Sequence, residues 1–198
     1  LAAGALSSAT GANSIAIGSN SISTGTDSFS AGFNSSATAD NALALGSSAN
    51  ASAEGAYAAG LQANASAINS MAFGSQSSAS AQDSWAAGYQ AKASGINSTA
   101  LGTRSTASAL DSFAVGVGAK ATATNALAFG SQATAMNIDA TAIGYLSNAV
   151  GANSISIGSL SQAIGTDSSA FGYSAKTTNN NDLAVGTYAS AEGPTATA

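Results

Sequence analysis

The sequence predicts an all-β fold, a parallel β-roll (β-solenoid) built from coils of fourteen residues. Three observations lead to this prediction. Glycine recurs at a fixed spacing, apolar residues alternate with small ones beside it, and Asn or Asp recurs between the alternating stretches. Such regularity, without insertion or deletion, indicates a repeat architecture in which each repeat buries its apolar side chains by stacking on its neighbours.

The first element is a glycine that closes an x-Ala-x-Gly or x-Ser-x-Gly tetrapeptide in every repeat. This glycine column comprises Gly4, Gly18, Gly32, Gly46, Gly60, Gly74, Gly88, Gly102, Gly116, Gly130, Gly144, Gly158, Gly172 and Gly186. A column made only of glycine indicates a backbone conformation, or a close approach, that a Cβ would block.

The residues on either side of the glycine alternate as strands do. Bulky residues lie three and one before it, as at Ile15 and Ile17, and small residues lie three, five and seven after it, as at Ala49, Ala51 and Ala53. We therefore expect two strands of about five residues per coil, stacked in parallel on their equivalents. We expect the bulky face inside each coil, and the Ser/Ala face of the same strand towards neighbouring chains.

The second turn carries Asn or Asp five residues before the glycine, and Gly55 alone departs from this pattern. These side chains bond to nearby backbone in tight turns and tolerate left-handed dihedrals, so we interpret them as structural turn residues. The Asx column comprises Asn13, Asp27, Asn41, Asn69, Asp83, Asn97, Asp111, Asn125, Asp139, Asn153, Asp167 and Asn181.

The Asx column alternates between Asn and Asp over most of the chain, so the unit is a double coil of twenty-eight residues. One hypothesis is electrostatic: Asn halves the line of like charges and offers amide donors to the carboxylates. Replacing Asn97 and Asn125 with Asp should then destabilise the array more at pH 7 than at pH 4. The alternative is duplication of a twenty-eight-residue unit without electrostatic selection.

The composition argues against several classes of function. The chain has no Cys and no His, four Lys and Arg residues, 7% charged residues and a net charge of -5. We therefore expect no catalytic residues, no metal site, no cofactor and no nucleic-acid partner. An ice-binding solenoid would need a regular Thr face, and the outward column, which includes three lysines, is irregular.

The repeat resembles the YadA-like head repeat of the trimeric autotransporter adhesins, whose pattern is Asn-Ser-hydrophobic-Ala-hydrophobic-Gly-x-x-Ser. The stretches that carry the resemblance are Asn13–Gly18, Asn69–Gly74 and Asn153–Gly158, with Ser21, Ser77 and Ser161 at the last position. The resemblance covers essentially the whole chain.

This resemblance implies a left-handed parallel β-roll assembled as a homotrimer, exposed on the outer membrane of a Gram-negative bacterium. Residues 1–198 are expected to form a single head domain, without the neck, stalk and membrane anchor of such proteins. The implied partners are a second and third copy of the chain and a host extracellular matrix protein or cell-surface receptor. Any membrane contact would be made through the missing C-terminal anchor.

The sequence does not locate a ligand site, but two columns are candidates. Lys92, Lys120 and Lys176 could contact an acidic partner, or could simply keep the outer sheet soluble and discourage edge pairing. Tyr89, Tyr145 and Tyr173 could be binding anchors, or could pack between chains at a trimer corner. A structural spacer with no ligand of its own remains an alternative to an adhesive head.

Overall fold

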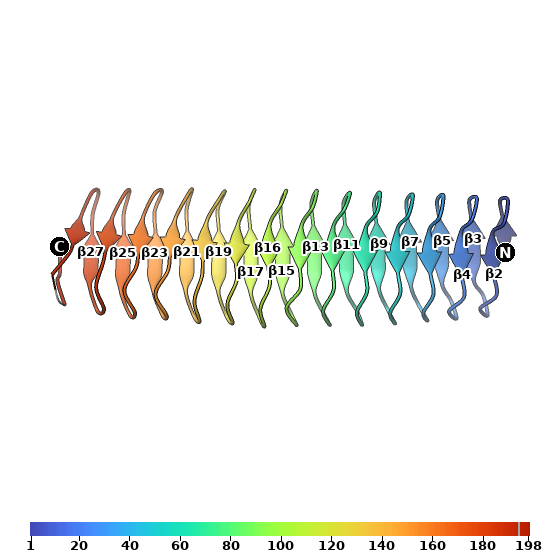
Figure 1. The fold of residues 1–198 in the computed structure, drawn as a ribbon, viewed down its shortest axis with the longest axis horizontal. Coiled ribbons are helices and arrows are strands. Elements are labelled where there is room, and N and C mark those ends of the chain that lie inside the picture. Colours follow the sequence, from blue (N-terminus) through green and yellow to red (C-terminus); the bar gives the residue numbers. More distant parts are fainter. Residues whose placement is uncertain (194) are drawn as a thin grey trace. The chain divides into compact units, whose positions relative to one another are not determined.

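The computed structural model describes residues 1–193 and 195–198. These residues form two compact units, Leu1–Ser98 and Thr99–Ala198, each a stack of flattened coils with two short strands and two turns per coil (Figure 1). In the part of the chain that is described, no helix is long and apolar enough to cross a membrane.

Each unit has two parallel sheets, one of three-residue strands that precede the column glycine and one of two-residue strands that follow it. In Leu1–Ser98 the first sheet contains β1 (Ala2–Ala3, cut short at the terminus), β3 (Ile15–Ile17), β5 (Phe29–Ala31), β7 (Leu43–Leu45), β9 (Tyr57–Ala59), β11 (Met71–Phe73) and β13 (Trp85–Ala87). Its second sheet contains β2 (Ser8–Ala9), β4 (Ile22–Ser23), β6 (Ser36–Ala37), β8 (Asn50–Ala51), β10 (Asn64–Ala65), β12 (Ser78–Ala79) and β14 (Lys92–Ala93).

The unit Thr99–Ala198 repeats this arrangement. Its first sheet contains β15 (Thr99–Leu101), β17 (Phe113–Val115), β19 (Leu127–Phe129), β21 (Thr141–Ile143), β23 (Ile155–Ile157), β25 (Ser169–Phe171) and β27 (Leu183–Val185). Its second sheet contains β16 (Thr106–Ala107), β18 (Lys120–Ala121), β20 (Thr134–Ala135), β22 (Asn148–Ala149), β24 (Gln162–Ala163), β26 (Lys176–Thr177) and β28 (Ser190–Ala191).

The register places each residue against its equivalent in the next coil. Met71 lies opposite Trp85, and Ala72 lies opposite Ala86, in parallel strands. The parallel β-solenoid expected from the repeat is therefore confirmed, but its strands are shorter than the five residues expected, because turns occupy more of each coil.

The interior of the coils contains small side chains, which reverses the expected orientation of the first strand. Ala16 is fully buried, whereas Ile15 and Ile17 on either side of it point away from the interior, with Ile17 42% exposed. The largest fully buried side chains among the described residues are only Thr177 and Asp182. The prediction that the bulky face lies inside each coil is thus wrong.

The turns explain why the interior is so thin. Ser21 N donates to Gly18 O at 3.3 Å, and Ser14 N donates to Gly11 O at 3.2 Å, so each sheet-to-sheet connection is a four-residue β-turn. Such a turn brings its first and last Cα atoms within about 7 Å, whereas sheets with large inward side chains pack about 10 Å apart. Only Ala, Ser and similarly small residues fit between the two sheets.

The two turns of a coil have the same design, so the coil consists of two similar halves. In both turns the third residue is left-handed, with φ of 57° at Asn20 in the glycine turn and 58° at Asn13 in the Asx turn. In both, the fourth residue points into the interior, as Ser21 and Ser14 do. The halves differ in what they show outside, which is bulky and apolar on the first sheet and mostly polar on the second.

The column glycines satisfy both of the conditions expected from the sequence. Their φ values lie between 118° and 143°, a region that side chains rarely adopt. They also lie against the backbone of the next coil: a Cβ on Gly60 would come within 2.6 Å of the Gly74 carbonyl carbon. Gly186 shares the dihedral, but the nearest atom to its Cβ position is Ala189 Cβ at 4.0 Å.

Candidate functional site

One candidate interaction surface is an apolar face, formed in each unit by the residues one and three before the column glycine. These side chains project from the first sheet, away from the Ala/Ser interior. Large members that are at least 36% exposed are Leu1, Ile17, Tyr57, Phe73, Trp85, Phe113, Phe129, Ile157 and Val185. Isolated apolar residues are normal on a protein surface, but a continuous apolar patch marks an interaction surface.

The opposite side of each unit is a polar face, formed by the residues four and six after the column glycine. It is mostly Ser, Thr, Asn, Gln and Lys, and side chains in it bond along the stack: Asn50 Nδ2 donates to Asn64 Oδ1 at 2.8 Å. Lys92 and Lys120 project from this face and are exposed. Lys176 lies in the same column and forms an ion pair with Glu192 at 3.5 Å.

The candidate tyrosines occupy the residue after the column glycine, at the glycine turn. Tyr89, Tyr145 and Tyr173 are 43%, 52% and 44% exposed. Tyr173 also contacts Tyr188 edge to face, with ring centroids 5.4 Å apart. All three tyrosines are thus accessible in the single chain, where they could serve either as ligand anchors or as contacts with another copy.

The Asx column forms a ladder in which Asn donates to Asp. Asn13 Nδ2 donates to Asp27 Oδ1 at 2.9 Å, and the same bond joins Asn69 to Asp83 at 3.0 Å. In the second unit it joins Asn125 to Asp139 at 2.9 Å and Asn153 to Asp167 at 2.8 Å. All Asx-column residues have φ between 53° and 61°. The alternation therefore joins an Asn coil to the following Asp coil through a side-chain hydrogen bond, which is the role that the electrostatic hypothesis gives to the Asn amides.

A second column of left-handed residues was not foreseen. It lies two residues after the column glycine, has φ between 54° and 68°, and comprises Leu6, Asn20, Asn34, Ser48, Gln62, Gln76, Gln90, Arg104, Gly118, Gln132, Leu146, Leu160, Ser174 and Tyr188. Asn and Gln are frequent in this column, and this frequency was the signal in the sequence, but the leucines and the tyrosine obscure it. For Leu or Tyr the left-handed conformation costs about 1–2 kcal/mol per residue.

The glycine-x-x-serine spacing has a structural role in the turns. Ser77 Oγ donates to Gly74 O at 2.8 Å, and Ser161 Oγ donates to Gly158 O at 2.8 Å. Each serine points inward and bonds to the first carbonyl of its own turn. At Ser77 and Ser161 the turn thereby buries a small side chain whose hydroxyl is satisfied locally, whereas Ser21 Oγ, at the same position of its coil, is buried without a hydrogen-bond partner.

Asp182 takes the place of a buried turn serine near the C-terminal end. Its carboxylate accepts hydrogen bonds from the backbone N–H of Asn179 and from that of Ala196, both at 2.8 Å. Burial raises the pKa of the Asp182 carboxyl, but the backbone donors, which include Thr178, outweigh burial and lower that pKa below its ordinary value of 3.8. The charged carboxylate thus links the last coil to the one before it.

No cluster of three or more His, Cys, Asp or Glu residues that could hold a metal ion occurs among residues 1–193 and 195–198. The side chains on both faces are chiefly apolar groups, hydroxyls and amides. This arrangement is suited to contact with another surface.

Comparison with known proteins gives one family match and one similar solved structure. A family model described as the YadA head domain repeat matches residues 1–21, 23–49, 51–77, 79–105, 107–133, 137–161 and 163–189. Among solved structures, the chain is similar to the collagen-binding domain of the Yersinia adhesin YadA, with 20% identity and a TM-score of 0.29, over 96% of this chain and 67% of that one. No match was found among curated proteins.

Proposed function

Because this chain belongs to the family of YadA head domain repeats, we propose that residues 1–198 act as one adhesive head domain on the surface of a Gram-negative bacterium. The head works as a homotrimer and attaches the cell to extracellular matrix, host cells or other surfaces. It has no catalytic role and needs no cofactor. The apolar face is the observation that carries the proposal.

The apolar face is the surface that joins the three copies. Trp85 and Phe129 are 39% and 51% exposed in the single chain, and equivalent positions repeat in coil after coil. Full burial of one such side chain stabilises by about 1.5–3 kcal/mol. A strand with packed side chains on both faces needs a partner on each side. The interior supplies the first, and a neighbouring copy supplies the second.

The assembly is tested by a matched pair of substitutions in one coil. Phe73→Asp places a charge on the apolar face, and Ser78→Asp places the same charge on the polar face. We expect sedimentation equilibrium to show a trimer for the parent and for Ser78→Asp, and loss of the trimer for Phe73→Asp. A folded, monomeric parent would contradict the proposal.

The polar face is the surface left for ligands in such an assembly. Its repeated hydroxyls, amides and lysines offer many equivalent weak contacts, so that three chains together bind with an avidity that exceeds the affinity of any one contact. The test is binding of the trimeric protein to immobilised collagen, fibronectin and laminin, to host cells and to plastic. Attachment to at least one of these supports an adhesive head, and failure on all of them favours a spacer segment.

A further inference from the structure

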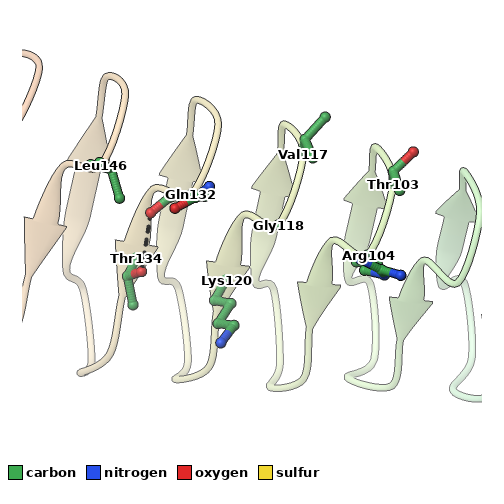
Figure 2. A pocket seen from close by; sticks show the side chains of 8 residues that line it. All are labelled: Thr103, Arg104, Val117, Gly118, Lys120, Gln132, Thr134 and Leu146. Carbon is green, nitrogen blue, oxygen red and sulfur yellow. Dashed lines mark hydrogen bonds between the residues drawn. The ribbon is translucent and has the colours of Figure 1, made fainter.

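The unit Thr99–Ala198 contains a surface pocket of about 520 Å³ where the glycine turn meets the second sheet. Figure 2 shows Arg104 and Val117 at successive turns, and Lys120 on β18. Pockets that hold small ligands have volumes of about 300–1,000 Å³. This pocket is therefore large enough for one or two sugar residues.

The pocket exists because Gly118 lacks a side chain. Gly118 belongs to the column two after the column glycine, where the neighbouring coils carry Arg104 and Gln132. A Cβ on Gly118 would meet only Gln132 Cγ, at 3.6 Å, so the space above this backbone is open. In the other unit, three successive coils carry glutamine in the same column, and Gln90 Nε2 donates to Gln76 Oε1 at 2.8 Å.

The charge around this opening is positive in an otherwise acidic chain. The protein has four Lys and Arg residues and a net charge of -5, and Arg104 and Lys120 line the same pocket. Both are exposed. Two cations beside an open notch favour an anionic group, which guanidinium and ammonium donors bind through charge-assisted hydrogen bonds.

The remaining lining is mixed in a way that suits a sugar. Thr103 and Thr134 bring hydroxyl groups and Gln132 brings an amide, while Val117 and Leu146 bring apolar surface. A sugar ring presents hydroxyl groups at its rim and apolar C–H groups on its faces. The lining therefore offers a partner to each part of an acidic sugar.

A peptide is a poorer fit, because the backbone at the pocket is already paired between coils. Gly118 N donates to Thr103 O at 2.9 Å, and Gln132 N donates to Val117 O at 2.8 Å. Extended peptides commonly bind by adding a strand to a free sheet edge, and the pocket presents no such edge.

From the notch, the two cations and the mixed lining, we propose that this pocket binds an acidic saccharide through its carboxylate or sulfate group. The proposal rests on the adhesive function only in that it names a ligand class for the head. Arg104 and Lys120 hold the anionic group, and the space above Gly118 admits the ring.

The first measurement compares acidic sugars with a neutral one on the whole chain. Sialyllactose and a glucuronate disaccharide test a carboxylate, a sulfated disaccharide tests a sulfate, and lactose is the neutral control, each followed by NMR titration. We expect at least one acidic sugar to bind at least about tenfold more tightly than lactose, and to weaken as salt is raised. Equal binding of lactose would overturn the proposal.

The decisive variant is Gly118→Gln, which fills the notch without disturbing the fold. Gln62, Gln76 and Gln132 hold the same position of their coils with φ of 56–58°, and Gly118 has φ of 68°. We expect this variant to lose at least about tenfold in affinity for the acidic sugar, and Arg104→Gln and Lys120→Gln to weaken it as well. Unchanged binding by Gly118→Gln would overturn the proposal.

The matched control is Lys92→Gln. Lys92 holds the same position of its coil as Lys120, but its coil carries Gln90 where the other carries Gly118. We expect this variant to bind like the parent. An acidic glutamate peptide that binds as tightly, with the same dependence on Gly118, would overturn the assignment to a saccharide.

Failure of this proposal can be told apart from failure of the adhesive function. If Gly118→Gln still attaches to matrix or cells while the parent binds no acidic sugar, the saccharide site is refuted and adhesion stands. If the parent binds the sugar but attaches to no surface tested, the site stands and the wider adhesive function fails.

Discussion

In Leu1–Ser98, the residue directly before the column glycine alternates between bulky and small, whereas in Thr99–Ala198 it is bulky in every coil. The first unit has Ala3, Ile17, Ala31, Leu45, Ala59, Phe73 and Ala87 at this position. The second reads Leu101, Val115, Phe129, Ile143, Ile157, Phe171 and Val185. At the position three before the glycine the contrast is reversed. This residue is bulky in every coil of the first unit, up to Trp85 in the last, whereas Thr99, Thr141 and Ser169 occupy it in the second.

The interiors of the two units do not differ in this manner. Ala58 in the first unit and Ala128 in the second are both fully buried, each between two outward side chains. The comparison teaches that the coil fixes the inward residue and leaves the outward residue free, so the two units can carry different apolar surfaces on the same frame.

The largest expected effect is on the glycine column, which both units share. Gly60→Ala and Gly116→Ala combine a forbidden dihedral with a clash against the next coil, at Gly74 and Gly130 respectively. Each should lower the free energy of unfolding by about 3 kcal/mol or more. Gly186→Ala, which has the dihedral but no coil backbone against it, should cost less. Urea unfolding measures all three, and equal losses would show that the clash is unimportant.

A smaller effect distinguishes inward from outward positions in a single strand, β9. Ala58→Leu overfills the interior and should cost about 2–3 kcal/mol. Ala59→Leu, which gives the first unit the bulky pattern of the second, should change the stability of the single chain by less than about 0.5 kcal/mol. Thermal unfolding of the two variants in the Phe73→Asp background, where the chain is expected to be monomeric, compares them. A large loss in Ala59→Leu would mean that the outward position is constrained after all.

The Asx ladder should respond equally in the two units. Asn69→Asp and Asn125→Asp each replace an amide donor with a carboxylate beside Asp83 or Asp139. Each should cost about 1–2 kcal/mol at pH 7, from the lost hydrogen bond and the new repulsion. The cost should be smaller at pH 4, where carboxylates are partly protonated. Unfolding at both pH values tests this, and an equal loss at each would favour duplication without electrostatic selection.

The smallest effect is confined to the last coil of Thr99–Ala198. Because the pKa of Asp182 lies below 3.8 in the folded chain, its contribution to stability is present above the pKa of the unfolded chain and is lost as pH falls through the folded value. Hydrogen exchange of the Ala196 amide, followed from pH 5 to pH 2, should therefore lose protection only below pH 3.8, as the carboxylate is protonated. In Asp182→Asn, protection should be low over the whole range. A parent amide whose protection is the same at pH 5 and pH 2 would contradict this account.

Much of the fold follows from the sequence, because each column has one dominant residue type. The glycine column, the Asx column and the parallel stacking were all predictable from spacing alone. The orientation of the first strand was not, since alternation shows that Ile15 and Ile17 share a face but not which side that face takes. The turn-limited gap between the sheets decides it, and this gap is a property of the three-dimensional coil.

The local features that depend on a single residue were harder to foresee. Arg104 and Leu146 hide the second left-handed column, because neither favours that conformation by itself. The pocket depends on Gly118 and on side chains contributed by adjacent coils, so a column-by-column reading did not reveal it. Lys120 was a candidate ligand residue from its sequence column. Arg104 was not, and only the folded coils bring it to the same pocket as Lys120.

Because the two halves of each coil are similar, the folding chain could pair its strands in a wrong register. A slip of one half-coil would return small residues to the interior while exchanging the apolar and polar exteriors. The interior alone therefore discriminates weakly against this error. The glycine column does discriminate, because its φ of 118–143° is absent from the first residue of the Asx turn, where Ala39 and Ala67 are tolerated. The glycine column thus fixes the register, because only its residues can adopt the backbone conformation of the glycine turn.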